Sequence, residues 1–426
     1  MIFRGKVGAN AHNEKDAANG IKSAWVRSYP VDVVLRVRPK DVCVCVMAGS
    51  ETSGLFGTPK QVAVERGLAE FRSGRPVIVT SADERAVALP VDGMTDERLA
   101  SFRTLCAPGR PHLLVTARRA RALGLDAAGP TGLAIGDLHN AAAIFSLAAE
   151  AQVTRRLEVV AVSETAPAAI ELAKLAQLLP ALLVGDGKTA AVGADDPPLV
   201  RVAADAVAQF RRAAIASLAV VAETAIPLNG GLPARFVVFR DAIGGTPIAV
   251  IVGKPDLARP VSVRLHSACL TGDVFGSRRC DCGDQLRLAL PQLEQNGGGI
   301  ILYLEQEGRG LGLANKIRAY QLQEAGLDTV DANTVLGFDD DERDYGVAVR
   351  MLQLLGCTRV RLLTNNPAKL DGLSHAGIDV SGRVPLHGPI NSDNRRYLTA
   401  KATRAGHQLD HILDVLDEPG ENPSER

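Results

Sequence analysis

The sequence predicts an α+β fold with mixed α/β layers, divided into an N-terminal α/β domain and a C-terminal domain. Segments with strand and helix patterns alternate along the chain, which is typical of layered folds. The chain has 426 residues, which is more than one ordinary domain contains. A segment at 228–233 (LNGGLP) separates two groups of elements, because Gly, Pro and Asn favour turns. We therefore expect domains at 61–230 and 231–412.

The N-terminal half is expected to contain helices and strands in alternation. Residues 1–60 are predicted to form an arm with short β segments within 31–47. Apolar residues at helical spacing predict helices, and short apolar runs predict strands. The helices are expected at 61–71, 96–105, 117–123, 168–179 and 202–221, and the strands at 77–80, 112–116 and 157–162.

The C-terminal half continues the same pattern. Strands are expected at 234–239, 247–252 and 299–304, and a further one leads into Thr364. Helices are expected at 314–324 and 345–355, and another is expected to begin after Gly283. The tail at 413–426 is polar and contains proline, so we expect it to be disordered.

Composition excludes several classes of protein. The 48 Lys and Arg residues balance 48 Asp and Glu residues, which argues against a general nucleic-acid-binding face. No apolar run reaches the roughly 18 residues of a membrane span, and the N-terminus lacks the apolar segment of a signal peptide. We therefore expect a cytoplasmic protein without membrane or nucleic-acid partners. The odd count of seven cysteines speaks against a disulfide framework.

Three of the cysteines form a Cys-x10-Cys-x-Cys pattern at Cys269, Cys280 and Cys282. Zinc binds thiolates readily, and a catalytic zinc site keeps three protein ligands and an open fourth position. The spacing leaves two alternatives open. A structural site would take a fourth ligand such as His266, and the cysteines could instead be small buried residues.

Three further segments carry polar residues at the ends of expected strands. The segment at 303–313 combines a glycine-rich turn with Arg309 and a following helix, a layout that suits phosphate but also an ordinary turn. The acidic run at 339–345 contains Asp341 and Arg343, and it could simply cap the next helix. The segment at 362–369 places Thr364 and Lys369 at a turn that suits a phosphate or base contact, although turn chemistry explains it equally well.

Taken together, the four segments resemble the GTP cyclohydrolase II family, whose enzymes open riboflavin synthesis. The matching stretches are VRLHSACLTGDVFGSRRCDCGDQL, YLEQEGRGLGLANKIRAYQLQ, DTVDANTVLGFDDDERDYG and RLLTNNPAKL, and they span about 261–410. The resemblance implies that Cys269, Cys280 and Cys282 bind zinc. It also implies a general base at Asp341, a nucleophile at Arg343 and an active-site tyrosine at Tyr320. The implied nucleotide contacts are Arg264, His266, Ser267, Gln285, Glu307, Gly308, Arg309, Thr329, Thr364 and Lys369.

The resemblance also implies the reaction. GTP and water would give a 2,5-diaminopyrimidinone ribosyl phosphate, formate and pyrophosphate, with Mg²⁺ on the triphosphate and a homodimer as the working form. Zinc would activate water near neutral pH, and Asp341 would relay protons. A guanidinium stays protonated because its pKa is very high. We therefore expect Arg343 to act at least as an electrostatic clamp, with covalent attack as the family's proposal.

One residue departs from the family pattern and keeps two other functions open. Many members carry Glu directly before the first zinc cysteine, whereas this chain has Ala268. The chain could therefore be a sister cyclohydrolase that opens the ring of another nucleoside or nucleotide. A zinc-containing nucleotide sensor is the non-enzymatic alternative. The joint presence of Tyr320, Asp341 and Arg343 favours an enzyme, because a sensor needs binding groups alone.

The N-terminal half resembles 3,4-dihydroxy-2-butanone 4-phosphate synthase, which family chains often carry upstream. The stretches GRPVIV (74–79) and AAIELAKLA (168–176) carry this resemblance. The catalytic features of the synthase are missing. Its acidic Mg²⁺-binding loop would fall on 80–89, where only Asp83 and Glu84 remain, and its Gly-His-Thr-Glu turn becomes ETAP at 164–167. A hard cation then lacks its oxygen ligands. We expect a degenerate domain retained for folding, dimerisation or regulation.

Overall fold

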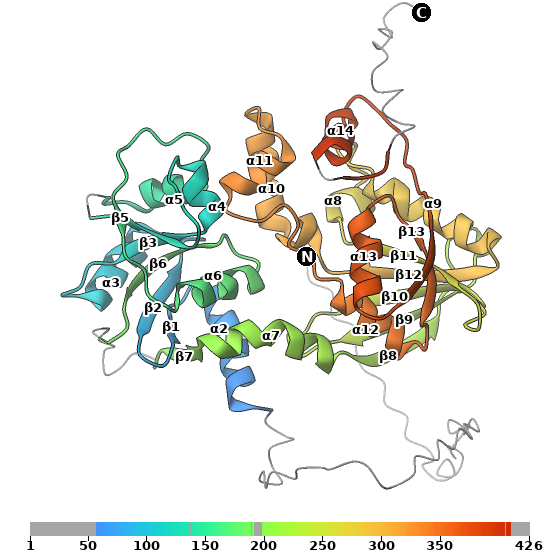
Figure 1. The fold of residues 1–426 in the computed structure, drawn as a ribbon, viewed down its shortest axis with the longest axis horizontal. Helices are drawn as coiled ribbons and strands as arrows, with labels where there is room; N and C mark the ends of the chain where they lie inside the picture. The colour runs from blue at the N-terminus through green and yellow to red at the C-terminus, as the bar shows by residue number, and fades with distance from the viewer. Residues whose placement is uncertain (1–56, 137, 189, 191–197, 405, 410–426) are drawn as a thin grey trace, which may run out of the picture. The chain divides into compact units, whose positions relative to one another are not determined.

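Two seven-stranded sheets organise the part of the chain that the computed structural model describes, namely residues 57–136, 138–188, 190, 198–404 and 406–409 (Figure 1). All of these residues belong to one compact unit. The mixture of helices with two mixed sheets confirms the predicted α+β class. The predicted arm at 1–60, except for its last four residues, and the predicted tail at 413–426 lie outside the described residues.

The first sheet has the strand order β5-β4-β3-β6-β2-β1-β7. Its central strands are apolar on both faces: Val77 and Val79 of β1 belong to one buried cluster, and Ile78 belongs to the other. This alternation follows from the two-residue period of a strand. The strands are β1 (Val77–Thr80), β2 (Arg85–Pro90), β3 (His112–Val115), β4 (Thr131–Ala134), β5 (Val159–Val160), β6 (Ala181–Asp186) and β7 (Val200–Ala203).

Helices cover both faces of this sheet. One buried cluster joins the sheet to α2, α6 and α7, and the other joins it to α3, α4 and α5. Side-chain caps begin four of the helices, where Thr58, Thr95, Thr116 and Asn140 accept hydrogen bonds from backbone N–H groups, as N-cap residues commonly do. The helices are α2 (Pro59–Arg72), α3 (Asp96–Cys106), α4 (Ala117–Ala122), α5 (Ala141–Ala149), α6 (Ala166–Leu175) and α7 (Ala204–Ser217).

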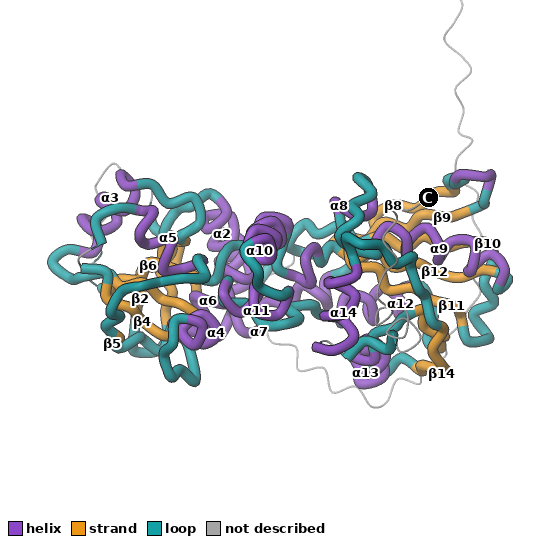
Figure 2. The backbone as a smooth tube through the Cα atoms, turned by 90° about the horizontal axis from the view of Figure 1, so that it is seen from above, coloured by secondary structure: helices purple, strands orange, loops and turns teal. Residues whose placement is uncertain are grey.

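The second sheet has the order β14-β13-β11-β12-β10-β9-β8. Its four strands β14, β13, β11 and β12 run parallel, and the remaining ones pair antiparallel. Figure 2 shows its strands stacked beside α9 and α12. The strands are β8 (Ala219–Ala225), β9 (Ala234–Arg240), β10 (Ile248–Gly253), β11 (Val261–Ser267), β12 (Gly298–Leu304), β13 (Arg359–Leu363) and β14 (Asp379–Val384).

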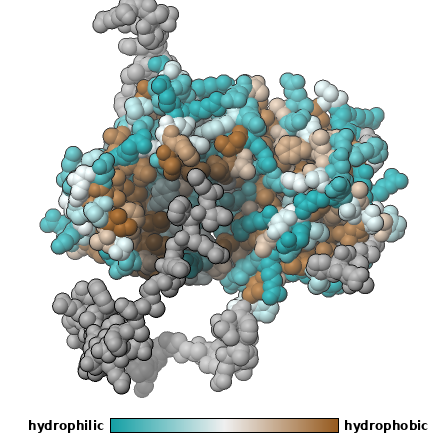
Figure 3. Space-filling view, turned by 180° about the vertical axis from the view of Figure 1, so that it is seen from behind, coloured by the Kyte–Doolittle hydropathy of each residue, from teal (hydrophilic) through white to brown (hydrophobic). Residues whose placement is uncertain are grey.

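Helices also lie on both faces of the second sheet. A large buried cluster joins the sheet to α12 and α13, and a smaller one joins it to α9. On the face that Figure 3 shows, hydrophilic and hydrophobic side chains are interspersed. The helices of this half are α8 (Leu270–Asp273), α9 (Cys282–Gln295), α10 (Leu313–Glu324), α11 (Thr329–Val335), α12 (Gly346–Leu354), α13 (Pro367–His375) and α14 (Arg395–Arg404), with 3-10 turns η1 (Asn229–Gly231) and η2 (Glu307–Gly310).

Helices α10 and α11 share a hydrophobic core with the first sheet. Ala319 of α10 and Ala332 of α11 belong to the same buried cluster as Leu113 of β3 and Ile144 of α5, and Figure 1 shows α11 and α10 beside α4. Arg119 of α4 extends this contact. Its guanidinium is buried and donates to the carbonyl oxygens of Leu147, Ser146 and Val335 at 2.9, 3.0 and 3.1 Å. The two halves of the sequence are therefore joined by packing and by buried hydrogen bonds.

The structure corrects the bounds of two predicted helices. The helix predicted at 202–221 is wrong at both ends, because Val202 lies in β7 and Val220 lies in β8, where it pairs with Phe239 of β9. β-branched valines favour strands. The second sheet thus begins at Ala219, before residue 231, where the sequence placed the domain boundary. Residues 80–89, on which the acidic loop of the synthase would fall, contain most of strand β2. The helix predicted to end at 179 ends at Leu175, and Gln177 takes a left-handed φ of 61°.

Among the described residues, none of the helices combines the length and the apolar character that crossing a bilayer requires.

Candidate active site

The candidate site lies at the edge of the second sheet where three neighbouring parallel strands end. Strands β12 and β13 both pair in parallel with β11. Their carboxyl ends lead into the segments that carry His266, Glu307 and Thr364. Ligands in open α/β sheets commonly bind outside the carboxyl ends of the strands, where the connecting loops converge. The fold therefore brings three of the four segments identified from the sequence to one place.

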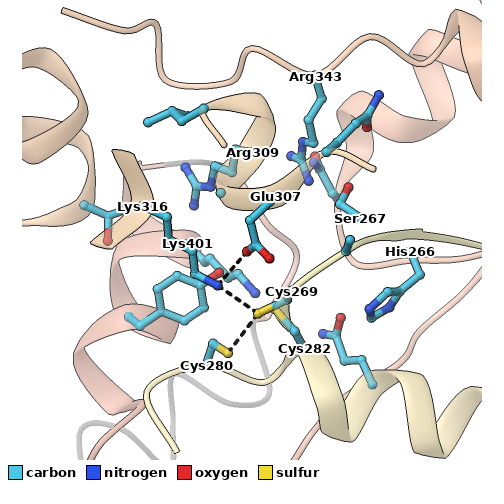
Figure 4. A pocket seen from close by; sticks show the side chains of 18 of the residues that line it. His266, Ser267, Cys269, Cys280, Cys282, Glu307, Arg309, Lys316, Arg343 and Lys401 are labelled. Carbon is cyan, nitrogen blue, oxygen red and sulfur yellow. Dashed lines mark hydrogen bonds and ion pairs between the residues drawn. The ribbon is translucent and has the colours of Figure 1, made fainter. Parts of the chain in front are cut away.

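The thiol groups of Cys269, Cys280 and Cys282 form a compact cluster at this edge (Figure 4). Their sulfur atoms all lie within 4.8 Å of one another, and the Sγ atoms of Cys269 and Cys280 are 3.7 Å apart. Cys269 directly precedes α8, and Cys282 is the first residue of α9. In the part of the chain that the structure describes, no other group of three or more His, Cys, Asp or Glu side chains has such spacing. Three thiols so placed suit a tetrahedral zinc ion with one open position.

Two glycines allow the sulfur atoms to approach. A Cβ atom at Gly272 would lie 3.0 Å from Sγ of Cys280 and 3.1 Å from Sγ of Cys269. A Cβ atom at Gly283 would lie 2.1 Å from the carbonyl oxygen of Gly272, so α8 and α9 could not pack as they do. The cluster thus depends on glycine at both positions.

Lys316 of α10 connects the thiol cluster with the glycine-rich turn. Its ammonium donates to Sγ of Cys269 at 3.1 Å, to Oγ1 of Thr271 at 2.9 Å and to Oε1 of Glu307 at 2.7 Å (Figure 4). Hydrogen bonds from the neighbouring thiols, together with this ammonium, lower the pKa of Cys269. Hydrogen bonding to Cys269 raises the pKa of Cys280 to about 11. The sulfur atoms share protons that a metal ion would displace, because metal binding requires thiolates.

Asp273, at the end of α8, organises the residues around the first cysteine. Its carboxylate accepts the backbone N–H of Cys269 at 2.9 Å, the hydroxyl of Tyr303 at 3.0 Å and a hydrogen bond with Nε2 of His266 at 3.0 Å. The rings of His266 and Tyr303 stack with 5.5 Å between their centres. Burial lowers the pKa of His266, and the Asp273 carboxylate only partly opposes this effect. His266 therefore favours the neutral form in the unliganded site.

The turn after β12 holds Glu307 and Arg309 over the cluster. Gly308 and Arg309 both have a φ of 62°, a left-handed conformation that is strained for a residue other than glycine. Oε2 of Glu307 accepts the backbone N–H of Leu270 at 2.7 Å, which ties the turn to α8. The strain at Arg309 thus occurs where the sequence predicted a phosphate contact.

The acidic run before α12 forms a network of ion pairs. The guanidinium of Arg343 donates to both carboxylate oxygens of Asp341, at 2.7 and 2.5 Å. Burial would raise the pKa of Asp341, but the hydrogen bonds from Arg343 and its positive charge together outweigh burial and lower the pKa. From the N-terminal half, Lys174 donates to Oε1 of Glu342 at 2.5 Å, and Arg118 pairs with Asp339 and Asp340 at 3.2 Å. These ion pairs go beyond the helix-capping role that the sequence alone would explain.

One pocket brings together the site residues predicted from the sequence, with the exception of Asp341. Asp341 reaches the pocket only through its ion pair with Arg343, which is a lining residue. The predicted residues that line the pocket are Arg264, His266, Ser267, Cys269, Cys280, Cys282, Gln285, Glu307, Gly308, Arg309, Tyr320, Thr329, Arg343, Thr364 and Lys369.

Four of the lining residues have buried polar atoms without a hydrogen-bond partner in the described structure. These atoms are Nε of Arg264, Nδ1 of His266, Oγ of Ser267 and Oε1 of Gln306. An unpaired buried polar group carries a desolvation penalty of about 1–3 kcal/mol, which a polar ligand would remove. Burial, followed by repulsion from Arg264, lowers the pKa of Lys369. An anionic ligand would restore its charge.

The sequence did not point to several residues that complete the site. Asp273 and Tyr303 lie within the matching stretches, and their contacts with His266 depend on the chain folding back after Cys269. Tyr397, Lys401 and His407 also line the pocket, and they come from α14 and the residues after it. An aromatic residue and a lysine four positions apart on a polar helix give no distinctive signal, because such pairs are common on helix surfaces.

Comparisons with known proteins agree with this geometry. The family model described as GTP cyclohydrolase II matches residues 219–385. The chain is 42% identical over 376 residues to the GTP cyclohydrolase-2 of Xylella fastidiosa strain Temecula1, which covers 87% of this chain and 93% of that protein. It is 41% identical over 362 residues to the GTP cyclohydrolase-2 of Azospirillum brasilense, covering 82% and 94%. The riboflavin biosynthesis protein RibBA of Bacillus cytotoxicus is 53% identical over 185 residues, which cover 42% of this chain and 46% of that protein.

The similarity to the first two relatives extends over most of both chains and so includes much of the N-terminal half. The thiol cluster, the pocket and these similarities agree, and the chain belongs to the GTP cyclohydrolase II family.

Proposed function

We propose that the protein is a zinc-dependent GTP cyclohydrolase II, which converts GTP into a 2,5-diaminopyrimidinone ribosyl phosphate, formate and pyrophosphate. This reaction is the first step of riboflavin synthesis. One observation carries the proposal: the three-thiol cluster and a set of cationic side chains line the same pocket. The names of the relatives from Xylella fastidiosa and Azospirillum brasilense support it.

Cys269, Cys280 and Cys282 would hold the zinc ion. When bound, zinc would supply the Lewis acidity that activates water for attack on the imidazole ring. Tyr320 would orient the substrate or water by hydrogen bonding. Burial raises the pKa of its hydroxyl, so the group stays protonated and can donate. The cationic groups of Arg279 and Lys316 lie 5.4 and 5.7 Å from the centre of its ring, which fixes the ring in place.

Asp341 and Arg343 would act as a pair in proton transfer and charge stabilisation. Because the pKa of Asp341 is lowered, its carboxylate is ionised at neutral pH and can accept a proton once Arg343 turns toward the substrate. Arg343 is buried against Asp341, which raises its pKa, so the guanidinium keeps its proton. An electrostatic clamp on the phosphate chain therefore agrees better with its environment than nucleophilic attack does.

Arg309, Arg343 and Lys369 would bind the triphosphate together with Mg²⁺. Nζ of Lys369 donates to the carbonyl oxygen of Leu265 at 2.8 Å, which holds the amine in the pocket. Phosphate would offset the repulsion that Lys369 meets from Arg264 and Arg343, because an opposite charge nearby favours the charged form. Pyrophosphate release requires such positive charge, because negative charge develops on the leaving group.

The test is GTP turnover by the purified protein, with products identified by mass spectrometry and zinc measured in the same preparation. We expect formate, pyrophosphate and the ring-opened product in a zinc-containing protein. Cys280→Ser should lose zinc and turnover together. Cys357→Ser is the matched control, because Cys357 is a fully buried free cysteine in the core beside β13. Full turnover by a zinc-free Cys280→Ser protein would contradict the proposal.

Ala268 supports a second candidate, a sister cyclohydrolase that acts on another nucleoside or nucleotide. Ala268 lines the pocket directly before Cys269, at a position where many family members have a carboxylate. Formate release would be followed with a panel of purine nucleotides and nucleosides. Release from another base and none from GTP would favour the sister enzyme, whereas tight binding without turnover of any compound would favour a nucleotide sensor.

We also propose that the N-terminal half is a degenerate 3,4-dihydroxy-2-butanone 4-phosphate synthase. Ala86, Val87 and Ala88 are buried in β2, where they leave no room for metal-binding carboxylates. The carboxylate of Glu84 accepts the backbone N–H of Glu164 at 2.6 Å, so it serves the fold. Incubation of the full chain with ribulose 5-phosphate and Mg²⁺ should give no dihydroxybutanone phosphate, and formation of that product would overturn this proposal.

We propose that the protein is a homodimer in solution. Strand β8 lies at the edge of the second sheet and is exposed along its whole length. Val220 and Val221 in this strand are each 44% exposed. An exposed edge strand can pair with another chain. Light scattering coupled to gel filtration should give twice the chain mass of 44.9 kDa, and a monomer at micromolar concentration would contradict the proposal.

A further inference from the structure

The segment that follows the family-model match closes one side of the pocket. The match ends at residue 385, whereas Tyr397, Lys401 and His407 line the pocket together with the matched residues. Helix α14 and the residues after it therefore belong to the site, although the family model does not include them.

Specific contacts hold this segment in place. Leu398 of α14 and Leu409 form a small buried cluster. The guanidinium of Arg396 donates to the carbonyl oxygen of Gly326 at 2.8 Å. The backbone N–H of Gln408 donates to the carbonyl oxygen of Asn365 at 2.9 Å, which ties the end of the segment to the turn after β13. These contacts fix the helix against both the α10–α11 connection and the edge of the sheet.

Lys401 is the first member of a buried chain of hydrogen bonds that runs through the site. Its Nζ donates to Oδ1 of Asp281 at 2.6 Å. Nε2 of Gln285 donates to Oδ2 of the same carboxylate at 2.6 Å, and Oε1 of Gln285 accepts from the guanidinium of Arg264 at 2.5 Å. Arg264 in turn donates to the carbonyl oxygen of Leu363 at 3.0 Å. The chain thus connects α14, the metal-binding segment, α9 and two strands.

The members of this chain are removed from solvent. The exposed fractions are 8% for Lys401, 2% for Asp281, 9% for Gln285 and 6% for Arg264. A buried carboxylate that loses its ammonium partner remains as an uncompensated charge, which is strongly destabilising. Because water cannot replace Lys401 freely, Asp281 would have to move.

The position of Asp281 makes such a movement consequential. Asp281 lies between Cys280 and Cys282, so its carboxylate and the two thiols share one short segment. The same carboxylate also fixes which end of the Gln285 amide faces Arg264. With Asp281 in place, Gln285 must present its oxygen to Arg264, because its NH₂ group is already engaged.

We propose that Lys401 is a positioning residue for the nucleotide and metal site. It holds Asp281, and through Asp281 it sets the Cys280–Cys282 segment and the orientation of Gln285 and Arg264 toward the nucleotide. This proposal rests on the proposed zinc site and nucleotide pocket. Lys401 is suited to the role because its ammonium also lies 4.5 Å from the centre of the Tyr397 ring, so the aromatic wall of the pocket and the ion pair fix the same group.

The test compares Lys401→Met, Asp281→Asn and the double variant with the wild type in the full-length, zinc-loaded protein. Binding of α,β-methylene GTP is measured by calorimetry, and zinc loss to a chromogenic chelator is followed over time. Thr403→Ala is the matched control, because Thr403 lies on α14, is exposed and bonds only to the carbonyl oxygen of Thr399 in the described structure. Circular dichroism is used to select a temperature at which every variant is folded.

We expect Lys401→Met to lose zinc about 10–100 times faster, as is usual when a group that supports metal ligands is removed. The dissociation constant for the nucleotide analogue should rise about tenfold, and Thr403→Ala should match the wild type. In the Asp281→Asn background Lys401→Met should add little, because the two residues act through one contact. A merely structural role would lower the unfolding temperature and leave both readouts unchanged in the folded protein.

The outcomes separate this inference from the proposed function. If the wild-type protein contains no zinc or does not turn over GTP, the proposed function is contradicted. The positioning role alone is overturned if the wild type contains zinc and turns over GTP, and if Lys401→Met stays within twofold of the wild type in its rate of zinc loss and in its dissociation constant for the nucleotide analogue. If Lys401→Met does not fold, the double variant is compared with Asp281→Asn, and a further loss of more than about threefold in either readout contradicts the proposal, since the coupling would be absent.

Discussion

Gly272→Ala tests the thiol cluster through a single added methyl group. Gly272 is buried in α8 and its φ lies outside the left-handed region, so alanine introduces no left-handed backbone strain and the perturbation is steric. The new Cβ atom would lie 3.0 Å from Sγ of Cys280, 3.1 Å from Sγ of Cys269 and 3.2 Å from Cβ of Cys282, whereas ordinary contacts begin at 3.4 Å. The sulfur atoms must therefore retreat by a few tenths of an ångström.

A movement of that size matters because zinc–ligand distances tolerate deviations of only about 0.2 Å. Overpacking of this kind costs about 1–3 kcal/mol, and since each 1.4 kcal/mol is a factor of ten, zinc should bind roughly 5–150 times more weakly. Zinc affinity is measured by competition with a chelator, and GTP turnover is measured with and without added zinc. Excess zinc should restore part of the turnover.

Gly382→Ala is the control, because a Cβ atom at that position meets nothing within 4 Å. It should leave zinc affinity and turnover at the wild-type level. If Gly272→Ala binds zinc as tightly as the wild type, the reasoning is refuted, because the sulfur atoms would then not surround the space beside this glycine.

Three further predictions concern the ion pairs around the site and the contacts between the two halves. Lys174→Met should lower the turnover number, whereas Lys174→Arg should keep most of it. Lys174 compensates the negative charge of the nearly buried Glu342, which lies beside the Asp341–Arg343 pair. Equal turnover in both variants would contradict this role. Arg119→Met should lower the free energy of unfolding, measured in urea, by about 3 kcal/mol or more, because three buried carbonyl groups lose their donor. A loss under about 1 kcal/mol would mean that water replaces the guanidinium. Asp341→Asn should lower the unfolding temperature by a constant amount between pH 5 and 7 and by less near pH 3. The reason is that the pKa of the Asp341 carboxyl is lowered in the folded protein. Such a group contributes stability that is complete above about pH 4 and is lost as the pH falls through the folded-state pKa. A difference that grows toward low pH would refute this assignment.

The grouping of the candidate site residues could be predicted from the sequence where these residues lie close together in the chain. Cys280 and Cys282 are separated by one residue, and Cys269 lies on the other side of a turn, so few folds could keep them apart. The polar residues at strand ends were also predictable, because parallel strands bring their carboxyl ends to one edge. The strands at 77–80 and 299–304 were predicted almost to the residue, because short apolar runs mark them in the sequence.

Contacts between distant segments were beyond such prediction. Lys401 meets Asp281 across 120 positions of the sequence, and Lys174 meets Glu342 across 168. Nothing in the local pattern around either lysine distinguishes it from a solvated surface residue. Strand β2 was missed for a different reason. The resemblance places an acidic loop at 80–89, whereas Val87 is a β-branched residue, which favours strands, and it pairs with Ile78.

The buried guanidinium of Arg119 has a consequence for how the protein can be divided. Residues 219–385 are what the family-model match alone would select as a minimal unit for expression. A fragment with those ends would leave the carbonyl oxygens of Val335 and Gly337 without the donors Arg119 and Thr116, and it would lack Lys401. Leu311, Ala319 and Phe338, which are buried against the first sheet, would face water. Low yield or aggregation of such a fragment would therefore say nothing about the chemistry of its active site.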